Sequence, residues 1–98
     1  MKFRNAGEVQ RDTVEGVSIE WREPDVAALC DVQIAISQES FGKAIQAFVA
    51  EHLIVVDGIR LPDDLEERKA KVAGMDDANA FSMIFERIYG GGEKLKNS

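Results

Sequence analysis

The sequence predicts a mainly α-helical fold, a small domain of about four helices with a short strand-like N-terminal segment or hairpin. Two stretches carry this prediction. Apolar residues recur three and four positions apart over 41–56 and again over 78–89, which places each set on one face of a helix. A third observation is the alternation of apolar and polar residues over 17–22, which is typical of a half-buried strand.

Length and composition indicate one folded domain. A chain of 98 residues can bury a modest core without disulfides or metals. We expect a single helical domain over 1–92, with an extended N-terminal segment over 1–23 and a flexible polar tail over 93–98. The apolar fraction of 45% and the charged fraction of 31% are those of a globular protein.

The charge balance narrows the class of partner. A net charge of −6 argues against binding the phosphate backbone of a nucleic acid, which needs clustered Lys and Arg, and favours basic partners. The longest apolar runs, 47–50 and 53–56, are too short to cross a membrane. No apolar stretch of signal-peptide length follows Met1. We therefore expect a soluble cytosolic protein with neither a nucleic-acid nor a membrane partner.

The N-terminal segment contains the predicted strand. Gly16 and the polar stretch 10–13 indicate a turn or loop before it, and a partner strand from around Phe3 or Val9 stays open. The strand itself is identified by its apolar members, which are Val17, Ile19 and Trp21.

A first helix begins after Glu23. Pro24 suits the first turn, and the charge of Asp25 is favourable at the positive end of the helix dipole. Whether 24–56 forms one helix or two is open at this point, although Ser37 and Ser40 are candidate N-caps and favour a break between them. The inner face of the first helix is predicted to hold Val26, Leu29 and Cys30, with Gln33 and Ile34 as further candidates.

The main apolar stripe ends at Asp57-Gly58. This dipeptide between β-branched residues is a hairpin signal, and Gly58 also suits the residue that follows a helix C-terminus. A helix that ends near Val55, followed by a tight turn and a short extended segment, reconciles both interpretations. The stripe comprises Phe41, Ala44, Ile45, Phe48, Val49, His52, Leu53 and Val56.

Two further helices follow Pro62. Asp63 or Asp64 is expected to cap the first of them, and Gly74 to end it. Asp76 is expected to cap the last helix. The apolar face of the last helix is formed by Ala78, Phe81, Ile84, Phe85, Ile88 and Tyr89.

The sequence offers little chemistry. His52 is the one histidine, and a pairing with Asp57 for acid–base work lacks a nucleophile beside it. Paired acids at 63–64, 66–67 and 76–77 stand at predicted helix starts and lack calcium-loop spacing. Cys30 excludes an internal disulfide and is expected to be a small buried hydrophobe. We expect no enzymatic activity, no metal and no cofactor.

Part of the apolar surface is left after two helices have packed together. Four apolar residues either complete the core or edge a groove for another chain, and these are Val49, Leu53, Val56 and Trp21. Core is favoured on the sequence alone. As a binding hypothesis, the same four residues are the predicted partner-binding site, and a second copy of the chain, giving a homo-oligomer, is an alternative partner.

The order of these parts resembles the tail assembly chaperones of long-tailed bacteriophages. The likeness covers roughly 20–90 and lies in five segments, Trp21-Arg22-Glu23-Pro24, Phe48–Leu53, Val55-Val56-Asp57-Gly58, the capped helix after Pro62, and Asp77–Phe81.

This resemblance implies a non-enzymatic protein of the host cytoplasm. It would bind the long, helical, aggregation-prone tape measure protein and keep it soluble until tail tube subunits assemble around it. Members of the family are often made in two lengths by a ribosomal frameshift. The alternative is a small acidic adaptor or inhibitor that binds a basic protein partner, and a small enzyme built around His52 is a third interpretation.

Overall fold

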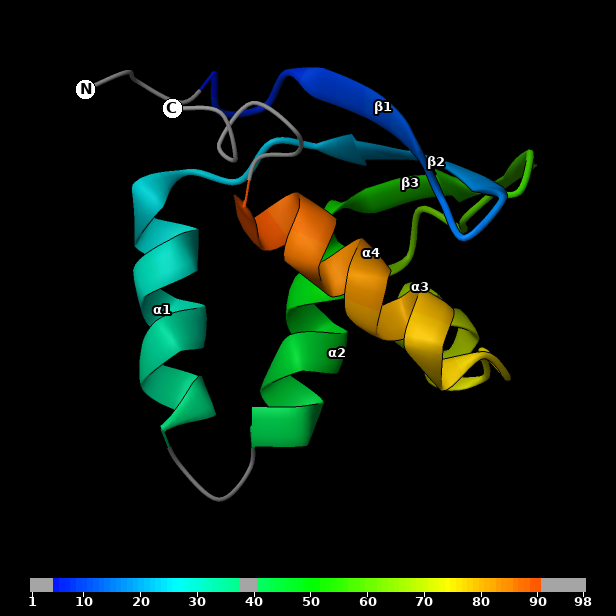
Figure 1. The fold of residues 1–98 in the computed structure, drawn as a ribbon. Coiled ribbons are helices and arrows are strands. Elements are labelled where there is room, and N and C mark those ends of the chain that lie inside the picture. The colour runs from blue at the N-terminus through cyan, green and yellow to red at the C-terminus, as the bar shows by residue number, and fades with distance from the viewer. Residues whose placement is uncertain (1–4, 38–40, 91–98) are drawn as a thin grey trace.

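The computed structural model describes residues 5–37 and 41–90, and these form an α+β fold (Figure 1). Four helices accompany a four-stranded antiparallel sheet in the order β1-β2-β3-β4. Along the chain the elements are β1 (Val9–Val14), β2 (Val17–Arg22), α1 (Val26–Ile36), α2 (Phe41–His52), β3 (Leu53–Val56), β4 (Ile59–Arg60), α3 (Leu65–Ala73) and α4 (Ala78–Gly90).

The prediction of a mainly α-helical domain is therefore wrong, and the error lies in the strands. The polar stretch 10–13, expected as a turn or loop, lies inside β1, and 53–55, expected as the end of a helix, lies in β3. Both segments are short, and β3 pairs with a strand far away in the sequence. Such pairing leaves no periodic signal in the local sequence. The tail predicted over 93–98 lies outside the described residues.

A tight hairpin joins β1 to β2. The register runs from Val9 opposite Arg22 to Val14 opposite Val17. The two turn residues both have positive φ, 51° at Glu15 and 79° at Gly16. This is the backbone of a type I′ turn, whose twist matches that of the flanking strands.

The Asp57-Gly58 dipeptide makes a second turn of the same kind. Its φ angles are 55° and 78°, and it joins β3 to the two-residue strand β4. The hairpin interpretation is therefore confirmed. The helix before it ends at His52, three residues earlier than the sequence suggested, and leads into β3 without a loop.

A β-bulge sets which residues of β3 face the helices. Ile19 lies opposite Val56, but the register then shifts so that Trp21 lies opposite Leu53. The extra residue, Ile54, brings Leu53 onto the same face as Trp21. Without the shift, Leu53 would point away from the core.

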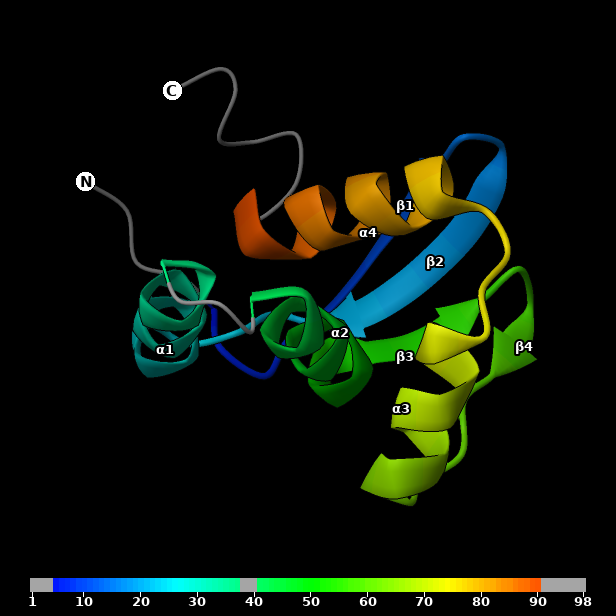
Figure 2. The same cartoon turned by 90° about the horizontal axis from the view of Figure 1, so that it is seen from below.

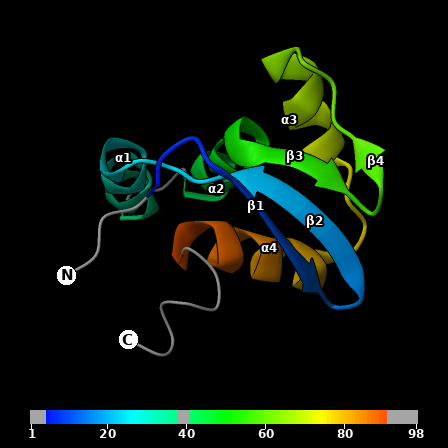
Figure 3. The same cartoon turned by 90° about the horizontal axis from the view of Figure 1, so that it is seen from above.

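The helices cover one face of the sheet. In Figure 1 the sheet lies above the helices, and the view from above in Figure 3 shows the strands in front of α4. Figure 2, seen from below, shows α4 along β1 and β2 and α3 on the side of β3 and β4. α1 lies past the end of β2, beside α2 and away from the sheet.

The core fills the space between the sheet, α2 and α4. The strands contribute Val14, Ile19, Trp21 and Leu53, and α2 and α4 supply most of the other side. Three rings, Phe48, Phe85 and Tyr89, pack near α2, with centroids 5.6–6.4 Å apart. The buried helical and loop residues around this core are Val32, Phe48, Val49, Ala50, Leu61, Val72, Ala80, Ile84 and Ile88.

Aspartates begin three of the helices. Asp25 accepts from the amide of Ala28 at 2.8 Å, and Asp64 accepts from the amide of Glu67 at 3.0 Å. The last helix is capped by Asp77, not by the predicted Asp76, because Asp77 accepts from the amide of Ala80 at 3.0 Å. These side chains satisfy amides that a helix leaves without partners in its first turn.

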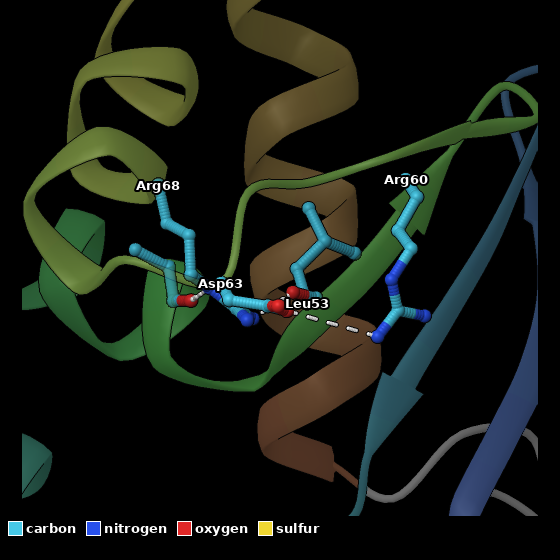
Figure 4. A network of polar contacts seen from close by, with 5 residues as sticks. Leu53, Arg60, Asp63 and Arg68 are labelled. Carbon is cyan, nitrogen blue, oxygen red and sulfur yellow. Dashed lines mark hydrogen bonds and ion pairs between the residues drawn. The ribbon is translucent and has the colours of Figure 1, made fainter.

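Arg68 of α3 caps the C-terminal end of α2. The Nε of Arg68 donates to the carbonyl of Ala50 at 2.7 Å, and its Nη2 donates to the carbonyl of Leu53 (Figure 4). These carbonyls lie where the helix gives way to β3, and the negative end of a helix dipole favours a cation there. Burial lowers the pKa of Arg68 and nearby Asp63 opposes that shift.

An ion pair ties α4 to the edge of the sheet. The guanidinium of Arg87 binds the carboxylate of Asp12 in β1, and both side chains are largely shielded from water. The pair joins residues far apart in the sequence. α4 is therefore held to the sheet by both apolar packing and charge.

Candidate protein-binding surface

The first helix exposes apolar side chains to solvent. All residues of α1 except Asp31 and Gln33 are apolar, yet Val32 is its one buried residue. Val26 is 64% exposed and Ile34 is 60% exposed. A helix that is apolar all round is normally buried, so this exposure marks α1 as a candidate interface.

Four exposed apolar residues of α1 form one face, which we call the α1 stripe. Val26, Cys30 and Ile34 lie four residues apart, and Ala27 lies beside them. Residues at this spacing share one side of a helix. The structure thus reverses the predicted orientation, because three of the residues assigned to the inner face lie on the outer one. The Cys30 thiol is exposed and not buried as expected.

The position of α1 explains this orientation. The chain leaves β2 at Arg22, passes the buried residues Glu23 and Pro24, and starts the helix at the Asp25 cap. This connection directs α1 past the end of the sheet, where α2 is its main neighbour. Ala28, Leu29 and Val32 lie on the side of α1 that packs against the core, and the other side is left without a cover among the described residues.

A cleft of about 280 Å³ runs between α1 and α2, and we call it the α1–α2 cleft. Its floor is made largely of small apolar side chains. Two carboxylates, from Asp31 and Glu51, stand at its rim, and both residues are exposed. The lining consists of Ala28, Asp31, Val32, Ala35, Ala44, Ala47, Phe48 and Glu51.

The structure places three of the four predicted partner-binding residues in the core. Trp21 is 2% exposed, and Val49 and Leu53 are fully buried. Val56 is half-buried and packs against the same core. These residues therefore lie in the core and do not edge a groove. A partner would reach Trp21, Val49 and Leu53 only if the core opened.

His52 has a local structural contact. Its Nδ1 donates to the carbonyl of Phe48 at 2.8 Å, and its ring lies 4.7 Å from the Phe48 ring. Asp57 stands in the β-turn at the far end of β3, so the geometry does not bring it to His52. Nothing in this arrangement positions His52 as a general base.

The paired acids act at helix starts in the part of the chain that the structure describes. Asp64 and Asp77 cap α3 and α4, and Asp63 lies 3.8 Å from Arg60. Across residues 5–37 and 41–90, no group of three or more His, Cys, Asp or Glu residues could hold a metal ion. The helices of the same residues are too short or too polar to cross a bilayer.

Sequence reasoning missed both the α1 stripe and the α1–α2 cleft. The signal was present, because 26–36 is more uniformly apolar than any other predicted helix. Such a segment was assigned to the core because apolar residues usually are. The comparisons add no further guide, because no family model, curated protein or solved structure matches this chain.

Proposed function

We propose that this protein is a non-enzymatic tail assembly chaperone that binds a helical tape measure protein before the tail tube polymerises. The observation that supports the proposal is the α1 stripe. Exposed apolar residues on a well-formed helix suit the binding of another helix. The resemblance of the sequence to tail assembly chaperones supplies the identity of the partner.

The architecture supports such a role physically. α1 is folded against α2, so its apolar side chains are held in place and little conformational entropy is lost when a partner covers them. The core itself is closed, because Trp21, Leu53 and Ile84 are buried between the helices and the sheet. A chaperone needs this division, because its own core must stay closed while one face engages an apolar client.

Aggregation of the client provides the functional test. We expect a gene for a long helical tape measure protein beside this gene. That protein is produced alone and together with the chain, and the soluble fraction and light scattering are measured. We expect co-elution on size exclusion and a large drop in scattering. Ile34→Asp should abolish both while the thermal unfolding temperature stays unchanged.

A matched control separates charge from position. Ile59→Asp places the same charge on an equally exposed isoleucine of β4, which is 67% exposed. The control variant should keep the client soluble. Failure of the wild-type chain to bind the neighbouring tape measure protein, or absence of a gene for a long helical protein beside it, would overturn the proposal.

A small acidic adaptor is the second candidate function. The observation in its favour is the pair of exposed carboxylates, Asp31 and Glu51, at the rim of the α1–α2 cleft. Stable binding to a basic regulator or nuclease, with no binding to a tape measure protein, would favour this alternative.

A further inference from the structure

The α1–α2 cleft presents two matched helix faces. On α1 the lining residues are 28, 31, 32 and 35, and on α2 they are 44, 47, 48 and 51. Both sets follow the spacing i, i+3, i+4, i+7, which is one side of a helix. The two helices run antiparallel and side by side (Figure 1). A third helix laid between them would contact both faces along their length.

The floor of the cleft suits bulky side chains from the occupant. Ala28 and Ala35 on α1 and Ala44 and Ala47 on α2 are half-buried, and their small side chains leave the space between the helices open. Distances between helix axes depend on the side chains at the contact, so alanines permit close approach. Large apolar residues of a partner, such as leucine or methionine, fit against such a floor.

The rim carries charge of one sign. Neither Asp31 nor Glu51 forms an ion pair with a described residue, and α1 contains no basic residue. Glu51 lies in the last turn of α2, near the sheet, and Asp31 lies in the middle of α1. The end of the cleft away from the sheet is lined by Ala35 and Ala44, so both acids lie toward the sheet end of the cleft, which Ala28 also lines.

We propose that the α1–α2 cleft binds one amphipathic helix of the partner, whose apolar stripe is flanked at one end by lysine or arginine side chains that pair with Asp31 and Glu51. This assignment rests on the proposed function and adds a second contact for the same partner, because the cleft lies on the α2 side of α1 and the α1 stripe lies on another side. Complementary rim charges select the partner and its direction in the groove.

A second copy of this chain fits the cleft less well. Docking α1 of another molecule there would bring a further Asp31 carboxylate toward Asp31 and Glu51 with no α1 cation to compensate. Like charges held close together at an interface oppose association. The charge pattern therefore favours a basic partner helix over self-association.

The test uses two synthetic helical peptides with the same leucine stripe. One carries lysines beside the stripe at one end, and the other carries glutamates at the same positions. Binding of each labelled peptide to the full chain is measured by fluorescence anisotropy at low and high salt. We expect the lysine peptide to bind at least tenfold more tightly and to lose affinity as salt rises.

Two sets of variants locate the site. The double variant Asp31→Lys, Glu51→Lys should weaken the lysine peptide about tenfold or more and strengthen the glutamate peptide. The control Glu67→Lys, Glu86→Lys makes the same change in net charge at exposed positions of α3 and α4 and should leave the preference intact. Ala35→Phe, which fills the cleft, should weaken both peptides without lowering the unfolding temperature.

Each other outcome overturns the proposal. Equal effects of the two double variants would show attraction to net charge alone, and unchanged binding by Ala35→Phe would place the site elsewhere. A concentration-dependent dimer that Ala35→Phe abolishes would assign the cleft to a second copy. If the tape measure protein binds the Asp31→Lys, Glu51→Lys variant as tightly as the wild type, this inference fails while the proposed function stands.

Discussion

The first and last helices of this protein both carry many apolar residues, but they differ in how much of that apolar surface is buried. α4 buries Ala80, Ile84 and Ile88 beneath the sheet, whereas α1 buries Val32 alone and exposes Val26 and Ile34. α1 is the more uniformly apolar of the two. An apolar composition therefore makes a helix able to enter a core, but the position of the helix relative to the sheet decides whether it does.

The connections to each helix explain the difference. After β4 the chain forms α3 on the side of the sheet that the helices cover. It then returns as α4, which runs along β1 and β2 on the same side (Figure 2). α1 follows directly from the end of β2 and projects past it. An ion pair between Arg87 and Asp12 holds α4 to the sheet, and no equivalent pair joins α1 to the sheet among the described residues.

The largest expected effect comes from truncating equivalent isoleucines in the two helices. Ile84→Ala, at a fully buried position, should lower the free energy of unfolding by about 3–4 kcal/mol because it opens a cavity in the core. Ile34→Ala, at a position 60% exposed, should change it by less than about 0.5 kcal/mol. Urea unfolding measures both, and similar losses for the two variants would break the comparison.

The second prediction concerns α2, which supports both helices. Arg68→Met should cost about 2–3 kcal/mol, because two charge-assisted hydrogen bonds to the carbonyls of Ala50 and Leu53 are lost. Arg60→Met serves as the control, since its exposed pair with Asp63 contributes about 0.5 kcal/mol or less. Chemical denaturation of the two variants gives the difference, and equal losses would remove the assigned role of Arg68.

The third prediction tests the charge that tethers α4. Asp12→Ala should cost about 1–2 kcal/mol, because it leaves the poorly exposed guanidinium of Arg87 without its partner. Glu20→Ala breaks the more exposed pair with Arg11 on the same sheet and should cost about 0.5 kcal/mol or less. A double-mutant cycle with Arg87→Ala measures the coupling, and a coupling near zero would contradict the tether.

The smallest effect is expected at the cap of α1. Asp25→Ala should cost about 1 kcal/mol, since it removes the acceptor for the amide of Ala28. Because α1 packs mainly against α2, the lost stability should appear as faster amide hydrogen exchange within α1, while exchange of the α4 amides stays unchanged. Asp77→Ala, the matched cap variant on α4, should instead accelerate exchange in the core, and the reverse pattern would show that α1 is the better anchored helix.

Much of the secondary structure could be predicted because its signals are local. The break between the first two helices, the strand at 17–22, the end of α3 at Gly74 and the turn at Asp57-Gly58 depend on capping groups, alternation and turn chemistry within a few residues. The same is true of the apolar face of α4. Local signals do not distinguish helix from strand at 53–56, because that segment becomes a strand by pairing with β2, which is distant in the sequence.

The candidate surface was harder to predict for the same reason. By sequence alone, Trp21, Val49 and Leu53 fit either the core or a groove. The pairing of β2 with β3 and the packing of α4 over the sheet place them in the core. The bulge at Ile54 turns Leu53 toward the core, and no sequence pattern predicts this bulge. The exposed face of α1 was assigned inward because its neighbours in space were unknown.

The sequence by itself determined where most of the helices lie, which residues cap them and how the two tight turns form, because these depend on short-range sterics and hydrogen bonds. Only the tertiary structure decided that the strands join into one sheet and that the apolar side of α1 faces solvent. Burial is a property of what packs against a residue, and that partner comes from a distant part of the chain.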